Sequence, residues 1–187
     1  MPAKPLVLAV ASLLAVASCG TAASRKSVAD RAPVPETPAS TAPPSLSPSQ
    51  LAKVLKDTPT GYDPSRNAPS DISAALVKAR TDKRPVLLDF GADWCPECRA
   101  MLRVYREDEV LPMLSRYHVV AVNVGRFNRN LDVAHRYGLS VQRTGIPAFV
   151  VLAPSGEVKV VTEESAFTGE ESVTPRKVNT FLSHWWQ

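Results

Sequence analysis

Proline is distributed so unevenly along this 187-residue chain that only one part of it can form a regular core. Nine of the 17 prolines fall between Pro33 and Pro69, whereas the sequence after Pro69 is sparse in proline and rich in valine and leucine. Proline lacks a backbone N–H and fixes φ, so this density excludes long helices and central strands. We therefore expect residues 19–69 to be a disordered tether and residues 70–187 to be one domain.

One stretch of the predicted tether has a helical pattern. In SPSQLAKVLKD, Ser49 is a candidate N-cap, and Leu51, Val54 and Leu55 fall on one face of a short helix over residues 49–57. Such a helix could pack on the domain. The domain start is therefore open anywhere between residues 49 and 70.

The net charge of +4 invites a nucleic-acid partner, but the predicted domain does not carry that charge. Residues 70–187 contain 15 Lys and Arg against 14 Asp and Glu, a balance of +1. A nucleic-acid-binding domain normally shows a clear basic excess. We expect solvated helix faces with mixed charges and no nucleic-acid partner.

The first nineteen residues, MPAKPLVLAVASLLAVASC, have the form of an export signal. The apolar run from Leu6 to Ala17 is shorter than the roughly 20 residues of a membrane-spanning helix. Its end, Val-Ala-Ser-Cys19 followed by glycine, resembles the lipobox of bacterial lipoproteins. That resemblance implies a signal peptide over residues 1–18, lipid on Cys19, and a place on the extracytoplasmic face of the cell membrane. Secretion after ordinary cleavage, or pairing of Cys19 with another thiol, are the alternatives.

Strand and helix patterns alternate through the predicted domain. Apolar runs predict strands, and apolar residues three and four apart predict helices. Strands are expected over residues 85–90, 118–124, 148–153 and 157–161, and helices from Ser70 or Asp71 to 79, then over 95–105, 108–116, 131–137 and 175–185. The turn Pro154-Ser155-Gly156 joins the last two strands as an antiparallel hairpin. This order predicts an α/β fold with a mixed sheet and helices on both faces.

Two cysteines, Cys95 and Cys98, stand at the predicted junction between the first strand and the next helix. A zinc site needs about four ligands, and the histidines that could join the pair (His118, His135 and His184) have no finger-like spacing. A structural disulfide would close a very small loop and stabilise little. Redox chemistry would make use of the position of the pair at a helix start, because the N-terminus of a helix stabilises the thiolate form of Cys95. The negative charge of Glu97 opposes formation of that thiolate.

Two longer stretches carry a family resemblance. VLLDFGADWCPECRAM resembles the first strand and active site of the thioredoxin superfamily, and RYGLSVQRTGIPAFVVLAPSGEV resembles its Gly-Ile-Pro loop and hairpin. The ADWC form is most similar to extracytoplasmic thioredoxin-like domains of the disulfide-reductase type. The resemblance implies a three-layer sandwich with a mixed central sheet and a redox-active Cys95–Cys98 disulfide in place of any bound cofactor or metal.

The resemblance also assigns roles to residues of this chain. It implies that Cys95 is the nucleophile, that Cys98 is the resolving cysteine, and that Asp89 is a buried acid that handles the proton of Cys98. It further implies a cis bond before a proline whose neighbouring backbone pairs with substrate. The substrate-facing positions are Trp94, Pro96, Ile146 and Pro147.

The sequence departs from the family pattern in two places. Ala121 replaces the lysine that often accompanies the buried acid, which puts the proton-transfer tuning in doubt. The loop over residues 140–144 is longer than in small thioredoxins, and its Arg143 is either a partner contact or a solvated loop charge.

These features predict a membrane-tethered, extracytoplasmic thiol-disulfide oxidoreductase, with reduction favoured over oxidation. Its partners would be exported proteins with disulfides or thiols, and another extracytoplasmic or membrane protein that exchanges electrons with it. Two other functions stay open. The pair could hold Cu(I) for delivery, or the domain could be a tethered interaction module without redox activity.

Overall fold

The computed structural model describes residues 45–187, which contain one four-stranded sheet. The strand order is β2-β1-β3-β4. The strands are β1 (Val86–Gly91), β2 (His118–Asn123), β3 (Ala148–Leu152) and β4 (Val158–Val161). β1 and β2 are parallel, whereas β3 runs antiparallel to both β1 and β4. The predicted strands and hairpin are confirmed. The predicted signal peptide and Cys19 lie outside the described residues.

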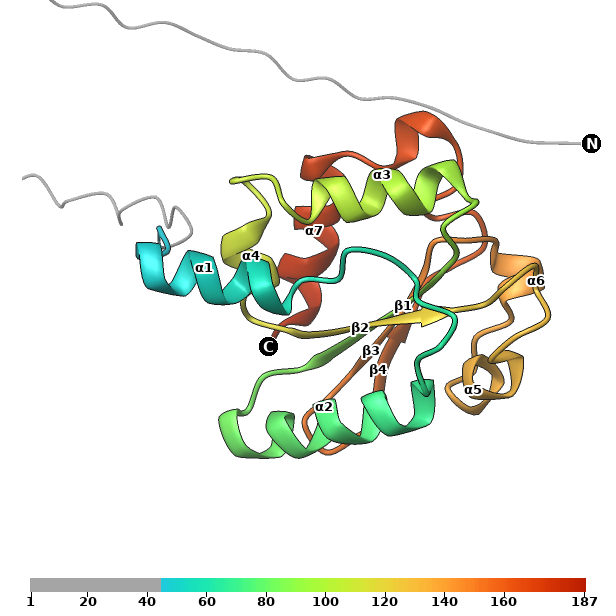
Figure 1. Ribbon diagram of the computed structural model, residues 1–187, viewed down its shortest axis with the longest axis horizontal. Helices are drawn as coiled ribbons and strands as arrows, with labels where there is room; N and C mark the ends of the chain where they lie inside the picture. The colour runs from blue at the N-terminus through green and yellow to red at the C-terminus, as the bar shows by residue number, and fades with distance from the viewer. Residues whose placement is uncertain (1–44) are drawn as a thin grey trace, which may run out of the picture. The chain divides into compact units, whose positions relative to one another are not determined.

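Helices cover both faces of this sheet. α2 (Ala68–Asp82) lies along one face, and α3 (Pro96–Val104) and α7 (Pro175–Trp185) lie on the other (Figure 1). α7 begins after Thr174, whose side chain accepts the Lys177 N–H, as the Thr-Pro pair predicts. The α/β three-layer sandwich expected from the sequence is confirmed.

The two central strands form the core. Every residue of β1 and of β3 is buried, which is what strands covered on both faces require. Asp89 is the one ionisable residue of β1, and it is 0% exposed. A carboxyl group in the middle of an apolar strand must find hydrogen-bond donors or lose its charge.

Two helices start earlier than the sequence predicted. α1 (Pro48–Asp57) is capped by Ser47 rather than Ser49, because Ser47 and Gln50 exchange side-chain to backbone hydrogen bonds in a capping box. α2 is capped by Asn67, whose side chain accepts the Ser70 N–H, so Ser70 and Asp71 lie inside the helix. In both cases polar residues compete within one turn, and the capping residue is the one that leaves a proline in the first two positions of the helix, Pro48 in α1 and Pro69 in α2.

The segment over residues 58–66, which we call the strap, belongs to the folded domain. Tyr62 is 0% exposed, and its backbone N–H donates to Asp93 Oδ1 at 2.9 Å. Asn123 Nδ2 donates to the Tyr62 carbonyl, and Arg129 Nη1 donates to the Pro64 carbonyl at 2.7 Å. The packed domain therefore begins before residue 70, the start that proline content predicts.

The remaining helices are short. The predicted loop over residues 140–144 contains α6 (Val141–Thr144), which ends at Gly145 with φ at 78°. The predicted helix over 108–116 shrinks to α4 (Leu111–Leu114), and α5 (Leu131–Arg136) lies where expected. Within residues 45–187, no helix is both long and apolar enough to cross a membrane.

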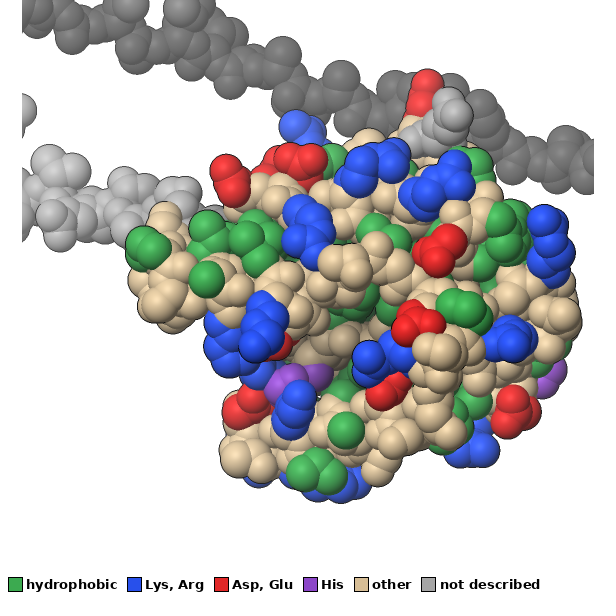
Figure 2. All heavy atoms as spheres, viewed as in Figure 1, with side chains coloured by type: hydrophobic (Ala, Val, Ile, Leu, Met, Phe, Trp, Pro, Cys, Tyr) green, Lys and Arg blue, Asp and Glu red, His purple; other side chains and the backbone are tan. Residues whose placement is uncertain are grey.

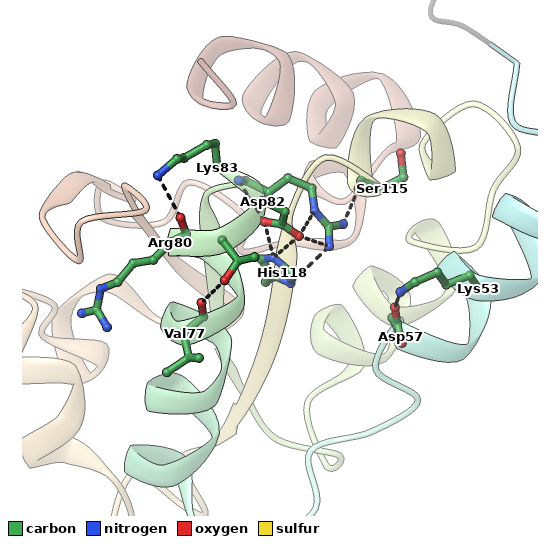
Figure 3. A network of polar contacts seen from close by, with 10 residues as sticks. Lys53, Asp57, Val77, Arg80, Asp82, Lys83, Ser115 and His118 are labelled. Carbon is green, nitrogen blue, oxygen red and sulfur yellow. Dashed lines mark hydrogen bonds and ion pairs between the residues drawn. The ribbon is translucent and has the colours of Figure 1, made fainter.

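Lys and Arg side chains are interspersed with Asp and Glu on the face shown in Figure 2. One such cluster ties the end of α2 to the start of β2 (Figure 3). Arg84 Nη2 lies 2.8 Å from Asp82 Oδ2, and His118 Nε2 lies 3.0 Å from both Asp82 carboxylate oxygens. Partial burial acts to raise the pKa of Asp82, but the hydrogen bonds from Arg84 and His118 outweigh it and hold that pKa well below its usual range.

We expect Asp82→Asn to lower the free energy of unfolding at pH 7 by about 1 kcal/mol, because it removes a carboxylate with charged and polar donors. A carboxyl group with a depressed folded pKa stabilises above its unfolded pKa and loses that contribution as the pH falls towards the folded value. The difference from wild type should therefore shrink below about pH 4. Urea unfolding at pH 7 and pH 3 measures it.

Asp57→Asn is the matched control, because Asp57 pairs with the exposed Lys53 on the surface of α1 (Figure 3). Exposed pairs contribute about 0 to 1 kcal/mol. An effect of Asp82→Asn at pH 7 that is no larger than that of Asp57→Asn would contradict the role assigned to this cluster.

Candidate active site

The strand β1 delivers the first cysteine to the start of a helix. Cys95 follows the end of β1 by four residues and is the N-cap of α3, where its Sγ accepts the Cys98 backbone N–H at 3.3 Å. Pro96 is the first residue of the helix, a position at which its missing N–H costs nothing. Both cysteines are free thiols, so the structure describes the dithiol form of the pair.

The two thiols lie in different environments. The Cys98 thiol and its backbone N–H hydrogen-bond to the Cys95 sulfur and lower the pKa of Cys95, while burial and Glu97 act in the opposite direction. The interaction with Cys95, together with burial, raises the pKa of Cys98 well above its usual range. Cys95 is 3% exposed and Cys98 is 0% exposed. Cys95 is therefore the thiol with the lower pKa and the slightly more accessible sulfur.

Two oxygen atoms approach the Cys95 sulfur. Glu97 Oε2 lies 3.3 Å from Cys95 Sγ, and the Ile146 carbonyl oxygen lies 3.5 Å from it. The peptide bond between Ile146 and Pro147 is cis, and it follows α6 directly. The loop before β3, 51 residues from Cys95 in sequence, is thus brought beside the thiol with its backbone facing it.

Asp89 lies inside the sheet and is held by two tyrosines that sequence reasoning did not single out as site residues. Tyr62 Oη donates to Asp89 Oδ1 at 3.0 Å and to Oδ2 at 2.9 Å, and Tyr105 Oη donates to Oδ2 at 3.0 Å. Burial raises the pKa of Asp89 to about 7, although the two hydroxyl groups act to lower it. In the described residues, Asp89 has no cationic partner, and its neighbour across β2 is Ala121.

Trp94 directly precedes Cys95 in the chain and is partly accessible. Its side chain is 42% exposed, and its Nε1 donates to the Gly125 carbonyl at 2.7 Å. The Phe127 ring packs edge-on against it at 5.9 Å, and the Arg126 guanidinium lies 5.6 Å from the ring centre. The loop after β2 therefore orients Trp94, a contribution that no motif in the sequence indicated.

Two other sequence-based candidates lie apart from this chemistry. Arg143, on α6, has a side chain that is 75% exposed, and its nearest acidic group is Glu164 at 4.0 Å. The imidazole of His118 bonds to Asp82 at the opposite end of the sheet from Cys95. Among residues 45–187, no group of three or more His, Cys, Asp or Glu side chains is arranged to hold a metal ion.

Comparisons with known proteins agree with this fold and with a thiol-based site. A family model described as thioredoxin-like matches residues 67–154. The thiol:disulfide interchange protein DsbD 2 of Pseudomonas aeruginosa is 30% identical over 119 residues, which cover 63% of this chain and 18% of that protein. DsbD 1 of the same organism is 34% identical over 91 residues, which cover 48% of this chain and 15% of that protein. The chain thus spans less than a fifth of the length of these curated relatives.

A solved structure covers nearly the whole of its own chain. The crystal structure of a disulphide isomerase from Xylella fastidiosa superposes with a TM-score of 0.62 at 30% identity. The match covers 66% of this chain and 94% of that one. The fold of this domain therefore has a counterpart among solved structures.

We expect Glu97→Gln to lower the apparent pKa of Cys95 by up to about one unit, because it removes a negative charge 3.3 Å from the sulfur. Alkylation of Cys95 by iodoacetamide should then be faster than in wild type at pH 6 to 7, and the rates should converge at higher pH. Stopped-flow or mass-spectrometric alkylation rates across pH measure the shift.

Glu107→Gln, which removes an exposed carboxylate beyond the end of α3, is the control and should leave the profile unchanged. If Glu97→Gln gives the wild-type profile, Glu97 has no part in setting the reactivity of Cys95.

Proposed function

We propose that this chain, which belongs to the thioredoxin-like family, is a membrane-tethered thiol-disulfide oxidoreductase that reduces disulfides in exported proteins. The observation that carries the proposal is the placement of Cys95 as N-cap of α3, with Cys98 buried behind it and the Ile146 carbonyl beside it. The thiol:disulfide interchange proteins among its relatives support the same chemistry.

The first half of the reaction uses Cys95. Its thiolate attacks one sulfur of a substrate disulfide, the substrate S–S bond breaks, and one substrate sulfur leaves as a thiolate. A mixed disulfide then joins Cys95 to the substrate. The backbone at Ile146, which already contacts Cys95 Sγ, is placed to pair with the substrate chain, and Trp94 and Pro96 offer exposed surface next to it.

The second half uses Cys98 and Asp89. Cys98 loses its proton, attacks the Cys95 sulfur, and forms the Cys95–Cys98 disulfide while the second substrate thiolate leaves. Two electrons pass from the dithiol to the substrate. Because the pKa of Cys98 is raised, this step needs a base, and Asp89, buried nearby with a pKa of about 7, takes that role. A separate reduced protein must then restore the dithiol.

The local charge favours reduction. A CxxC protein is strongly oxidising when its reduced form is stabilised by an easily formed thiolate. Glu97 is 3.3 Å from Cys95 Sγ and disfavours that thiolate. Ala121 removes the amine that would otherwise lie across from Asp89. These two residues support a reduction potential on the reducing side of the family range.

The tether gives this reaction its location. Residues 1–18 are proposed to direct export, and lipid on Cys19 to hold the domain at the outer face of a bacterial cell membrane. The roughly 25 residues between Cys19 and the described domain would act as the tether, and a random coil of that length has an end-to-end distance of about 25 to 30 Å.

The decisive test is a trap. Cys98→Ser should accumulate mixed disulfides between Cys95 and exported proteins, because the resolving thiol is gone. Non-reducing gels of intact cells, followed by mass spectrometry, measure them. Cys95→Ser/Cys98→Ser is the control and should trap nothing. If Cys98→Ser yields no covalent complexes in cells, the oxidoreductase function is wrong.

The direction is tested separately by the reduction potential. Equilibration of the purified domain with glutathione buffers should give a value more negative than about −200 mV, towards thioredoxin and away from the strong oxidants near about −120 mV. A potential near the oxidising end would overturn the reductase assignment and leave the exchange chemistry intact.

A further inference from the structure

The buried acid of the site is held by residues from outside the cysteine motif. Tyr62 comes from the strap, upstream of the family match that begins at residue 67. Tyr105 follows the last residue of α3. Both side chains are 0% exposed, so their hydroxyl groups have no water to bond and are committed to Asp89.

The strap fixes the Tyr62 ring at this place. The Tyr62 backbone N–H donates to Asp93, on the loop that follows β1. The Tyr62 carbonyl accepts from Asn123, the last residue of β2. The ring lies directly over Gly91, where any side chain would collide with the ring and the hydroxyl oxygen. A glycine at the end of β1 is therefore needed for Tyr62 to reach Asp89.

Within residues 45–187, the two tyrosine hydroxyls are the only side chains that donate to the Asp89 carboxyl group. Its neighbours across the sheet, Ala121 on β2 and Phe149 on β3, carry no charge. Cys98, on α3, is a further titratable group whose pKa the Asp89 charge raises. Burial keeps the pKa of Tyr62 and of Tyr105 well above the usual tyrosine value, so both stay protonated donors at working pH.

We propose that Tyr62 and Tyr105 are positioning residues that favour the ionised form of the Asp89 carboxyl group and aim it, and so set the pH above which Cys98 can be deprotonated and resolve the mixed disulfide. This inference rests on the proposed function and adds that the strap is part of the active site. Hydroxyl donors stabilise the charged form of a buried carboxyl group in the way that a nearby amine does elsewhere.

Oxidation of the reduced protein by 5,5′-dithiobis(2-nitrobenzoate) isolates the step. Attack by Cys95 releases one coloured thiolate at a rate that depends on reagent concentration. Attack by Cys98 on the resulting mixed disulfide releases the second at a rate that does not. The rate of the second phase, recorded from pH 5 to pH 9, reports how readily Cys98 is deprotonated.

We expect Tyr62→Phe to move the inflection of this profile upwards by about one pH unit, with a second phase roughly tenfold slower at pH 6 and wild-type rates near pH 9. Tyr105→Phe should shift it in the same direction. Gly91→Ala, which displaces the ring but keeps both hydroxyl groups, should also shift it. Tyr117→Phe is the matched control, because Tyr117 donates to the Leu182 carbonyl and does not touch the site.

The outcomes distinguish failure of the proposed function from failure of the role given to the two tyrosines. If the wild type lacks a concentration-independent phase, or if that phase survives in Cys98→Ser, the proposed function fails. If the wild type shows both phases but folded Tyr62→Phe or Tyr105→Phe keeps the wild-type profile, only the present inference is wrong. An equal slowing at every pH would mark the tyrosines as structural and would also overturn it. Circular dichroism checks folding, and any one folded variant decides the point.

Discussion

The structure depends on how one carboxyl group is accommodated inside an apolar strand. Asp89 lies in the middle of β1, the strand that pairs with both β2 and β3, so it cannot move towards water without breaking the sheet. An unpaired ion at this depth would cost several kcal/mol. Two tyrosine hydroxyls meet that requirement, and the chain has to bring them from either side of the cysteine motif. The strap, Gly91 and the end of α3 are placed so that both hydroxyl groups reach Asp89.

The same residue type behaves oppositely at the end of α2 and in the middle of β1. Asp82 is beside a guanidinium and an imidazole, and its pKa is held low although burial acts against this. The donors to Asp89 in the described part of the chain are neutral hydroxyls, and burial raises its pKa to about 7. The first is suited to a permanent structural charge and the second to gaining and losing a proton near neutral pH. The environment that the sheet creates, rather than the aspartate itself, decides which carboxyl group can take part in chemistry.

Local patterns predicted the elements that carry local signals. Apolar runs located β1 to β4, the Thr-Pro pair located α7, and the cysteine pair located the start of α3. The helix caps were misjudged by two to four residues where several polar residues compete within one turn. Tyr62 was missed for a different reason. Its contact with Asp89 spans 27 residues, and nothing near it in GYDPSRN distinguishes a buried hydroxyl donor from a turn residue. Tyr105 counted only as one of the apolar residues of a helix, because periodicity reports burial but not the polar end of a ring.

The folded domain extends further upstream than the stretch of sequence that the family model matches. A fragment cut at residue 67, where the family match starts, would retain both cysteines, Asp89 and the Ile146–Pro147 bond. It would lack the ring that fills the space over Gly91, and the vacated volume is lined by a carboxyl group able to bind water. Hydration of that space would bring the acid into contact with bulk solvent. Such a fragment would contain every residue of the motif and yet have a differently solvated interior, so the smallest unit that preserves this chemistry extends upstream to include the strap.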